Sequence, residues 1–282
     1  MSGSSSWFQD PNVLTAEIRR AHSPRAAAPE IHGYDELLHI AQGGQGVVYR
    51  GVQRSTRRSV AVKVHLDGGL ASGSARRRFE REVDLVASLK HPNIVSVYDS
   101  GTTEDGLMYL VMEYIEGVPL DEAVRSDGDR SPGLTLRQTL GLFASVCDAV
   151  QYAHQRGVIH RDLKPGNIRV DPAGQPHILD FGLAKAAGIL TDTAGGRDAR
   201  SVLSISGQFM GSLPWASPEQ ATGDPDQIDL RTDVYSLGVI LYQLLTGRFP
   251  YDVSSGLRPT LDNIVNAAPL HATSIRPDLG DE

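Results

Sequence analysis

The first half of the chain alternates apolar and polar residues in short segments, a period of two that predicts β-strands. Three segments rich in β-branched or aromatic residues show this best: 47–52, 59–66 and 107–115. Between them, residues 74–90 carry apolar residues at helical spacing, with arginine and glutamate at the other positions. A small β-sheet with one main helix is therefore predicted for residues 34–115.

The second half of the chain changes to helical periodicity. Helices are predicted at 136–155, 218–222 and 232–246, with short strands near 168–171 and 177–179. A strand-rich part followed by a helix-rich part indicates an α+β fold with two lobes. We expect the lobes to be joined near residues 113–117.

Two stretches depart from these patterns. Residues 1–33, rich in serine, alanine and proline, are predicted to form a flexible N-terminal tail. Residues 186–210 are a long polar segment, and such loops inside compact domains tend to be functional or disordered. The small lobe is therefore expected at 34–115 and the large lobe at 116–282.

The composition narrows the class of protein. A net charge of −7 argues against a general nucleic-acid binder, which would usually be basic. The single cysteine, Cys147, rules out an internal disulfide framework and fits a reducing compartment. No signal peptide opens the chain, and its most apolar segment, 233–247, is too short and too often interrupted to cross a bilayer. We expect a cytoplasmic location and no membrane contact within this chain.

Residues 40–51, IAQGGQGVVYRG, are the first candidate for chemistry. Glycines let backbone N–H groups approach a ligand closely, so clusters of them bind phosphates, but they also occur in ordinary hairpins. A phosphate-binding G-x-G-x-x-G loop would have its first glycine where this chain has Ala41. Taken alone, the segment leaves both interpretations open.

Four further motifs follow in a fixed order. They are VAVK at 60–63, VIHRDLKPGNIRV at 158–170, HILDFGLAK at 177–185 and WASPEQ at 215–220. Together they resemble the signature of protein kinases, specifically the eukaryotic-like (Hanks-type) serine/threonine kinases of bacteria. The resemblance runs from about Tyr34 to the end of the chain. It implies the two-lobed protein kinase fold, with a β-rich N-lobe and a larger, mostly helical C-lobe.

Four residues are expected to carry catalysis. The resemblance makes Lys63 the cation on the α- and β-phosphates, Asp162 the group that accepts the proton of the substrate hydroxyl, and Lys164 the cation at the γ-phosphate. Glu82 shares the apolar stripe of its helix, where a carboxylate is costly unless it is paired. We therefore assign Glu82 as the partner of Lys63, since Glu80 falls off that stripe.

The resemblance also implies a nucleotide and a metal ion. Asn167 and Asp180 would hold Mg²⁺, with Mn²⁺ as an alternative ion, and ATP would lie under the glycine-rich turn. The expected nucleotide-binding residues are Ile40, Ala41, Gly43, Gly46, Val48, Ala61, Lys63, Met112, Glu113, Ile115 and Arg169.

The chain departs from the family pattern in three places. Ala41 is tolerated in place of glycine if its φ is negative. Arg169 stands where relatives usually place an aliphatic side chain beneath the adenine, so its stem could cover the ring or its guanidinium could stack on it. Relatives also continue through further helices after residue 282. We therefore expect an incomplete C-lobe in which Glu219 lacks its usual arginine partner. The sequence leaves open whether a membrane anchor follows residue 282.

The leading hypothesis is an ATP-dependent kinase that transfers the γ-phosphoryl group to serine or threonine hydroxyls of protein substrates. Lys164 favours these acceptors, because tyrosine-specific relatives usually lack it. The alternatives are a catalytically impaired nucleotide-binding scaffold and, further from the motifs, a small-molecule kinase. A P-loop nucleotidase is excluded because no Gly-Lys dipeptide occurs in the chain.

Regulation is expected in the loop 182–211. Arg161 is the residue that in relatives pairs with a phosphate on this loop, and the spacing favours Ser204 and Ser206 as acceptors. Autophosphorylation in trans would require transient self-association. Asp233 is expected to hold the catalytic loop through backbone hydrogen bonds, a structural role.

Overall fold

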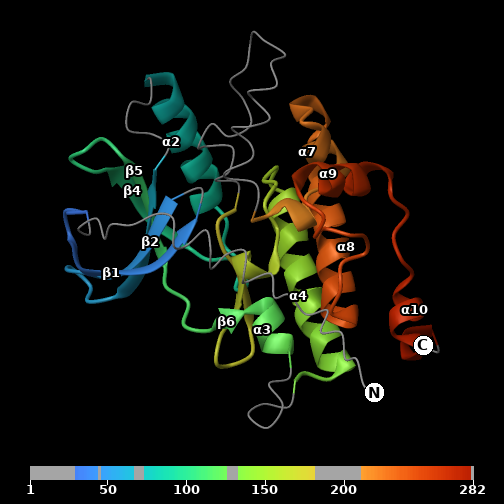
Figure 1. Cartoon of the computed structure of the whole chain (residues 1–282). Coiled ribbons are helices and arrows are strands. Elements are labelled where there is room, and N and C mark those ends of the chain that lie inside the picture. Colours follow the sequence, from blue (N-terminus) through green and yellow to red (C-terminus); the bar gives the residue numbers. More distant parts are fainter. Residues whose placement is uncertain (1–28, 44–45, 67–72, 126–132, 182–210, 281–282) are drawn as a thin grey trace, which may run out of the picture.

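The computed structural model describes residues 29–43, 46–66, 73–125, 133–181 and 211–280. It has a β-rich small lobe and a mostly helical large lobe, which is the two-lobed α+β fold predicted from the sequence (Figure 1). The predicted loop 186–210, with Ser204 and Ser206, lies outside the described residues, as does most of the predicted N-terminal tail.

Five antiparallel strands form the sheet of the small lobe, in the order β1-β2-β3-β5-β4. The strands are β1 (Tyr34–Gly43), β2 (Gly46–Gln53), β3 (Ser59–His65), β4 (Val97–Thr102) and β5 (Met108–Glu113). Helix α2 (Gly73–Ala87) covers one face of this sheet, where its Phe79 and Val83 share a buried cluster with Ala61 and Leu110. The apolar stripe seen in the sequence is therefore the buried face of the helix.

Strand β3 lies in the middle of the sheet and is buried on both faces. Val60, Val62 and Val64 belong to one apolar cluster, whereas Ala61 belongs to the cluster that includes α2. Because successive side chains alternate between the faces, Lys63 lies on the Ala61 side. Its side chain is thus enclosed rather than solvated, with only 4% of the residue exposed.

The large lobe is built around two long helices that lie side by side, α4 (Leu136–His154) and α8 (Leu230–Thr246) (Figure 1). Its other helices are α3 (Leu120–Val124), α7 (Pro218–Thr222), α9 (Leu257–Asn266) and α10 (Ala272–Ile275), with 3-10 turns at Pro165–Asn167, Leu213–Trp215, Pro225–Gln227 and Pro277–Gly280. A small antiparallel sheet has the order β6 (Val118–Pro119), β7 (Ile168–Val170), β8 (Pro176–Ile178).

The large-lobe core includes segments that carry the sequence motifs. Val146 of α4 and Ile240 of α8 are completely buried, and the same cluster contains Leu163, Ile168 and Phe181. These three residues come from the HRDLKPGNIRV and HILDFGLAK segments. The two motif segments are therefore anchored by apolar side chains that alternate with their polar ones.

Helix ends follow the capping residues of the sequence. Thr135 and Ser217 each open a helix, α4 and α7, with a reciprocal capping box to the glutamine three residues later. Asp229 caps the start of α8 by accepting from the Arg231 amide, and Gly247 ends it in the left-handed conformation at φ 68°. The start and end of α8 matter for function because Asp233 lies in its first turn.

Most predicted elements are confirmed, with small shifts at their ends. The helices predicted at 136–155, 218–222 and 232–246 correspond to α4, α7 and α8, and the predicted strands correspond to β2, β3, β5, β7 and β8. Strand β4 and helices α9 and α10 were not predicted individually. Ile31 is buried in the small-lobe core, so packing begins slightly before the predicted boundary at Tyr34. No helix of the described residues is both long and apolar enough to cross a membrane.

His65, the last residue of β3, is completely buried, with its ring edge-on to Phe79 of α2 at 5.5 Å between centroids. Neither ring nitrogen has a hydrogen-bond partner in the described part of the chain. Burial, with a smaller effect of the Lys63 charge, lowers the pKa of His65 from 6.5 to about 4, whereas the Asp180 charge acts in the opposite direction. The imidazole is therefore neutral in the folded protein.

We expect this histidine to make folding acid-sensitive. Between about pH 6.5 and pH 4 the unfolded chain takes up a proton that the folded chain does not, so stability falls as the pH falls. The loss attributable to His65 is about 2 kcal/mol at pH 5 relative to pH 7. Chemical denaturation of His65→Leu and of the parent at pH 5 and at pH 7 measures this loss of stability.

The matched control for this experiment is His39→Leu, because His39 is an exposed histidine on β1. From pH 7 to pH 5 the stability of His65→Leu relative to the parent should rise by about 2 kcal/mol, and that of His39→Leu should stay constant. A gap for His65→Leu that stays constant from pH 7 to pH 5 would contradict the prediction.

Candidate active site

Lys63 and Asp180 form an ion pair between the two lobes. Lys63 Nζ donates to Asp180 Oδ2 at 2.9 Å, and both side chains are mostly buried. Burial raises the pKa of Asp180, but the charge and hydrogen bond of Lys63, with smaller effects of His160 and His65, outweigh it and leave the pKa below its ordinary value. Asp180 is therefore ionised at neutral pH and faces an enclosed Lys63.

The segment between α4 and β7 brings a second group of polar side chains together. Lys164 Nζ lies 3.1 Å from Asp162 Oδ2, and Asn167 Nδ2 donates to the backbone oxygen of Asp162 at 2.7 Å and to its Oδ2 at 3.0 Å. Ser212 accepts a hydrogen bond from Lys164 Nζ and also bonds the carboxylate of Asp162. Three of the predicted site residues thus meet in one network, and Ser212 joins them from the WASPEQ side.

The Asp162 carboxylate is an ionised acceptor in this network. Burial raises the pKa of Asp162. The Lys164 charge, the hydrogen bond from Ser212 and the His160 charge together outweigh this effect and hold the pKa below its ordinary range. Asp162 is therefore suited to accept a hydrogen bond from a hydroxyl group.

A buried carboxylate from α8 holds the backbone of this segment, as predicted. Asp233 is completely buried; its Oδ1 accepts from the Arg161 amide and its Oδ2 from the His160 amide, both at 2.8 Å. The His154 ring also lies 2.7 Å from Asp233 Oδ2, and Gln220 Nε2 donates to the Arg161 carbonyl at 2.7 Å. The sequence did not indicate these last two contacts, because nothing in either residue's local pattern marks it.

These bonds stabilise an uncommon backbone conformation. Arg161 has a φ of 68° and Asp180 a φ of 58°, both in the left-handed region that costs a non-glycine residue about 1 kcal/mol or more. The Arg161 amide donates to Asp233, and the Arg161 carbonyl accepts from Gln220. These two hydrogen bonds hold Arg161 in its strained conformation. On Asp180 the following Phe181 is buried with its ring edge-on to His160, 4.8 Å between centroids.

Glu82 lies on α2 and is half-buried. Burial lowers the pKa of Arg161, while the charges of Glu82 and Asp233 raise it, so Glu82 lies within electrostatic range of Arg161. Arg161 Nε is buried without a hydrogen-bond partner in the described part of the chain. The assignment of Glu82 as the partner of Lys63 remains a prediction.

The glycine-rich segment is a β-hairpin between β1 and β2. Gly43 pairs with Gly46, and Ala41 pairs with Val48 in extended conformation, without the positive φ that would strain alanine. A Cβ added at Gly46 would collide with the carbonyl oxygen of Val64. Glycine is thus required at Gly46 by the close approach of β3, and Ala41 fits its position.

The other predicted nucleotide residues lie on β1, β2, β3, β5 and β7 and in the connection between the lobes. Ala61 and Met112 are paired across β3 and β5 and share a buried cluster with Ile115, against which Val48 packs. Glu113 ends β5, where the connection to the large lobe begins, and Ile40 is partly exposed on β1. Arg169 lies on β7 and donates to the carbonyl of Gly117 in the same connection.

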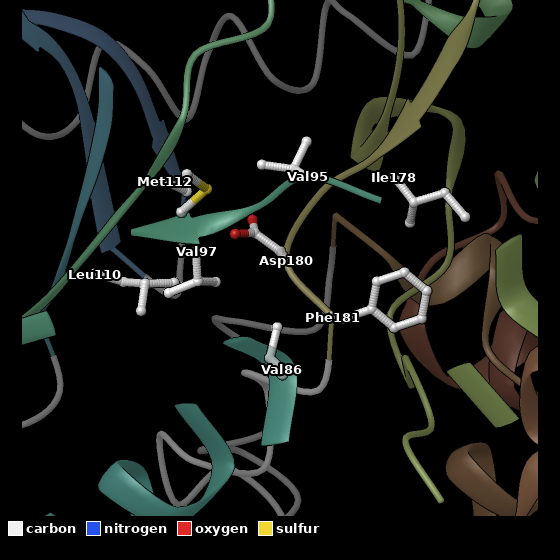
Figure 2. A pocket seen from close by; sticks show the side chains of 8 residues that line it. All are labelled: Val86, Val95, Val97, Leu110, Met112, Ile178, Asp180 and Phe181. Atoms are coloured by element: carbon white, nitrogen blue, oxygen red, sulfur yellow. The ribbon is translucent and has the colours of Figure 1, made fainter. Parts of the chain in front are cut away.

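A small pocket lies between α2, the sheet and the Asp180 segment (Figure 2). Its lining is apolar except for one carboxylate: Val86, Val95, Val97, Leu110, Met112, Ile178, Phe181 and Asp180. Figure 2 shows the Asp180 side chain directed toward Met112 and Val97, with Phe181 pointing the other way. Asp180 Oδ1 is buried without a hydrogen-bond partner in the described part of the chain.

The oxygen atoms of Asp180 and Asn167 fit a hard divalent cation. Mg²⁺ prefers oxygen ligands and is commonly held by one or two protein groups together with substrate phosphates. Asp180 Oδ1 has no other partner, and the Asn167 amide uses its nitrogen toward Asp162, which leaves its oxygen for a metal. The described residues contain no group of three or more His, Cys, Asp or Glu side chains that could hold a metal by themselves.

Comparison with known proteins decides the family. The sequence profile of the protein kinase domain matches residues 34–276, most of the chain. The chain belongs to the protein kinase family. Its motifs and its two lobes are therefore those of a kinase, and the resemblance stated from the sequence is confirmed.

The curated relatives of this kinase domain are bacterial. It is 37% identical over 236 residues to serine/threonine-protein kinase PrkC of Bacillus subtilis, covering 84% of this chain and 34% of the relative. It is 39% identical over 212 residues to serine/threonine-protein kinase PknB of Mycobacterium leprae, covering 74% of this chain and 32% of the relative. The chain thus spans about a third of the length of these relatives.

The solved kinase domain of Mycobacterium tuberculosis PknI has the same fold as this kinase. It superposes with a TM-score of 0.61 at 26% identity, covering 90% of this chain and 86% of that one. The fold prediction is confirmed by this likeness.

Proposed function

We propose that this chain is the catalytic domain of an ATP-dependent serine/threonine protein kinase that acts on protein substrates in the cytoplasm. The observation that carries the proposal is the network of Asp162, Lys164 and Asn167 beside the Lys63–Asp180 ion pair. It combines a hydroxyl acceptor, two cations and two oxygen ligands in one site, which is what phosphoryl transfer requires.

Each residue of the site has a distinct role in the proposed reaction. Asp162 accepts a hydrogen bond from the substrate hydroxyl, orients it and takes its proton. Lys164 lies close enough to Asp162 to meet the transferred phosphoryl group, and Lys63 would exchange its bond to Asp180 for the α- and β-phosphates. Bound magnesium ATP supplies the phosphoryl group and the metal charge, and Asn167 and Asp180 would hold that metal.

Asp233 acts on this chemistry only through the backbone. By accepting from the amides of His160 and Arg161, it fixes the position from which Asp162 projects. A misplacement of a reacting group by about 1 Å can cost on the order of 10²-fold in rate, so a rigid support for Asp162 is part of the mechanism.

We also propose that phosphorylation of the loop 182–211 raises the activity. The support is Arg161, next to the catalytic aspartate, with a buried Nε that has no hydrogen-bond partner in the described part of the chain. A phosphate at Ser204 or Ser206 would supply an acceptor and ~1–3 charge-assisted hydrogen bonds. Autophosphorylation in trans would require transient self-association of two copies.

Incubation of the chain with γ-labelled ATP, Mg²⁺ and a generic basic protein tests the proposed function. Label on serine or threonine of the protein substrate is expected, together with phosphate at Ser204 or Ser206 by mass spectrometry. Asp162→Asn is the control, because it keeps the shape of the site and removes the proton acceptor. A chain that binds the nucleotide but labels nothing would instead be the catalytically impaired scaffold.

A further inference from the structure

Gln220 is a buried glutamine in the first turn of α7, and both ends of its amide group form hydrogen bonds. Its Oε1 accepts from the Ser217 amide at 3.0 Å, and its Nε2 donates to the Arg161 carbonyl at 2.7 Å. Turning the amide over would set donor against donor and acceptor against acceptor, so these two bonds fix its orientation. An ionised glutamate could make the first bond but not the second.

Helix α7 does not itself require a glutamine at this position. Glutamate forms a capping box equally well, because the box uses only an oxygen of the side chain. The capping box of α4 shows the same contact, in which Gln138 Oε1 accepts from the Thr135 amide at 2.9 Å. The Nε2 of Gln220 therefore stabilises the segment of Arg161 rather than its own helix.

The bond from Gln220 reaches the peptide group directly before the proposed proton acceptor. The carbonyl of Arg161 and the amide of Asp162 belong to one planar unit. Its carbonyl accepts from Gln220, and its amide donates to His160 Nδ1 at 3.2 Å. His160 Nε2 lies 2.8 Å from the Leu179 carbonyl, which favours the tautomer whose Nδ1 is the acceptor. Both edges of the plane are therefore held, and so is the direction in which Asp162 leaves the backbone.

Asp233 holds a different part of this backbone. It accepts from the amides of His160 and Arg161, which lie in the two peptide groups before the Arg161 Cα. Arg161 has a φ of 68°, and a rotation about its ψ would turn the following peptide group without breaking either bond to Asp233. The hydrogen bonds to Gln220 and His160 oppose that rotation.

The segment that carries Gln220 also contacts Asp162 from its other end. Ser212 bonds the carboxylate of Asp162. Between these two ends, the Trp215 carbonyl accepts from Ser236 Oγ of α8 at 2.8 Å, which attaches the segment to the large-lobe core. One segment thus acts on Asp162 twice, at its carboxylate through Ser212 and at its backbone through Gln220.

We propose that Gln220 is a positioning residue for phosphoryl transfer, which orients the peptide group between Arg161 and Asp162 and so directs the proton acceptor toward the substrate hydroxyl. This inference rests on the proposed kinase function and adds a residue that touches neither substrate nor nucleotide. A misplacement of a reacting group by about 1 Å can cost on the order of 10²-fold in rate. Loss of the Gln220 donor should therefore lower kcat and leave the binding of MgATP unchanged.

Gln220→Glu tests this role, because it keeps the volume and the capping oxygen and removes the donor. Steady-state kinetics of the whole chain with MgATP and a generic basic protein give kcat and KM. The value of kcat is expressed per MgADP-binding site, counted by calorimetry, so that unfolded chains do not contribute. We expect kcat to fall about 10- to 10²-fold and the KM for MgATP to stay within about twofold. Gln220→Met, which is of similar size and uncharged, should lower kcat in the same direction and serves if Gln220→Glu does not fold.

The matched controls are Gln138→Glu and Gln138→Met, the same substitutions in the capping box of α4. Gln138 is exposed and lies about 24 Å along that helix from His154, the residue of α4 that contacts Asp233. Both controls should keep the parental kcat and KM.

Two results would overturn the inference. One is a kcat per site that stays parental in both Gln220 variants, even if they melt earlier, since a merely structural role predicts this. The other is a KM for MgATP that rises as much as kcat falls, which would assign Gln220 to nucleotide binding. A parent chain that binds MgADP but transfers no phosphate would overturn the proposed function before any variant is compared, and this inference with it.

Discussion

Replacing Asp180 with asparagine, or Lys63 with methionine, is expected to lower the rate of phosphoryl transfer by about 10²- to 10³-fold. Each substitution removes one charge of the pair that lies 2.9 Å apart between the lobes. In a site where catalysis is mainly electrostatic positioning, the loss of one such group costs ~3–4 kcal/mol of barrier. Initial rates at saturating MgATP measure the effect, and the exposed Lys90→Met is the control.

The same variants separate the catalytic role from the structural one. Either single substitution removes the Lys63–Asp180 ion pair while one of its two charges stays buried, which destabilises the fold, whereas the double variant removes both charges. The double variant should therefore melt above both single variants and still be inactive. Near-parental activity in either single variant would remove the kinase proposal, and additive melting changes would show that the two charges do not stabilise each other.

The second large effect is expected at Asp233, a residue that touches no substrate. Asp233→Asn replaces one carboxylate oxygen by an amide that donates rather than accepts, beside the amides of His160 and Arg161. We expect a loss of about 3 kcal/mol in stability, because hydrogen bonds to a buried charge are worth ~1.5–3 kcal/mol each. The folded protein should also be slower, with kcat falling more than the affinity for MgADP.

Asp229→Asn is the control for this helix, because Asp229 is exposed at the start of α8 and asparagine caps a helix as well as aspartate does. Denaturant melts and single-turnover rates of the two variants give the comparison. If Asp233→Asn retained parental stability and rate, the backbone of the catalytic segment would be held by other contacts.

The sequence predicted which polar residues the fold brings together where each of them lies in a local motif. Lys63, Asp162, Lys164, Asn167 and Asp180 lie in short segments whose alternation with buried apolar residues fixes their direction. The enclosed position of Lys63 follows from β3 being central in its sheet, and the strand pattern alone indicated that face.

The sequence could not predict contacts between distant residues that carry no pattern of their own. His154 is an ordinary last-turn residue of α4, and only its distance from Asp233 shows its role. Ser212 lies just before the WASPEQ motif, and its bond to Lys164 depends on the packing of two separate segments. For Arg169 the sequence left two orientations open, and the Gly117 contact limits them.

The bonds of Asp233 have a consequence for how this protein acquires its active form during synthesis. They join residues that are 72 to 79 positions apart. Closing such long loops lowers the entropy of the chain before the contacts can stabilise it. A chain emerging from the ribosome has residues 154–164 outside long before α8 follows. The nascent protein therefore holds every motif up to DFG while residues 160–161 still lack their anchor, and we expect activity only once α8 has been synthesised.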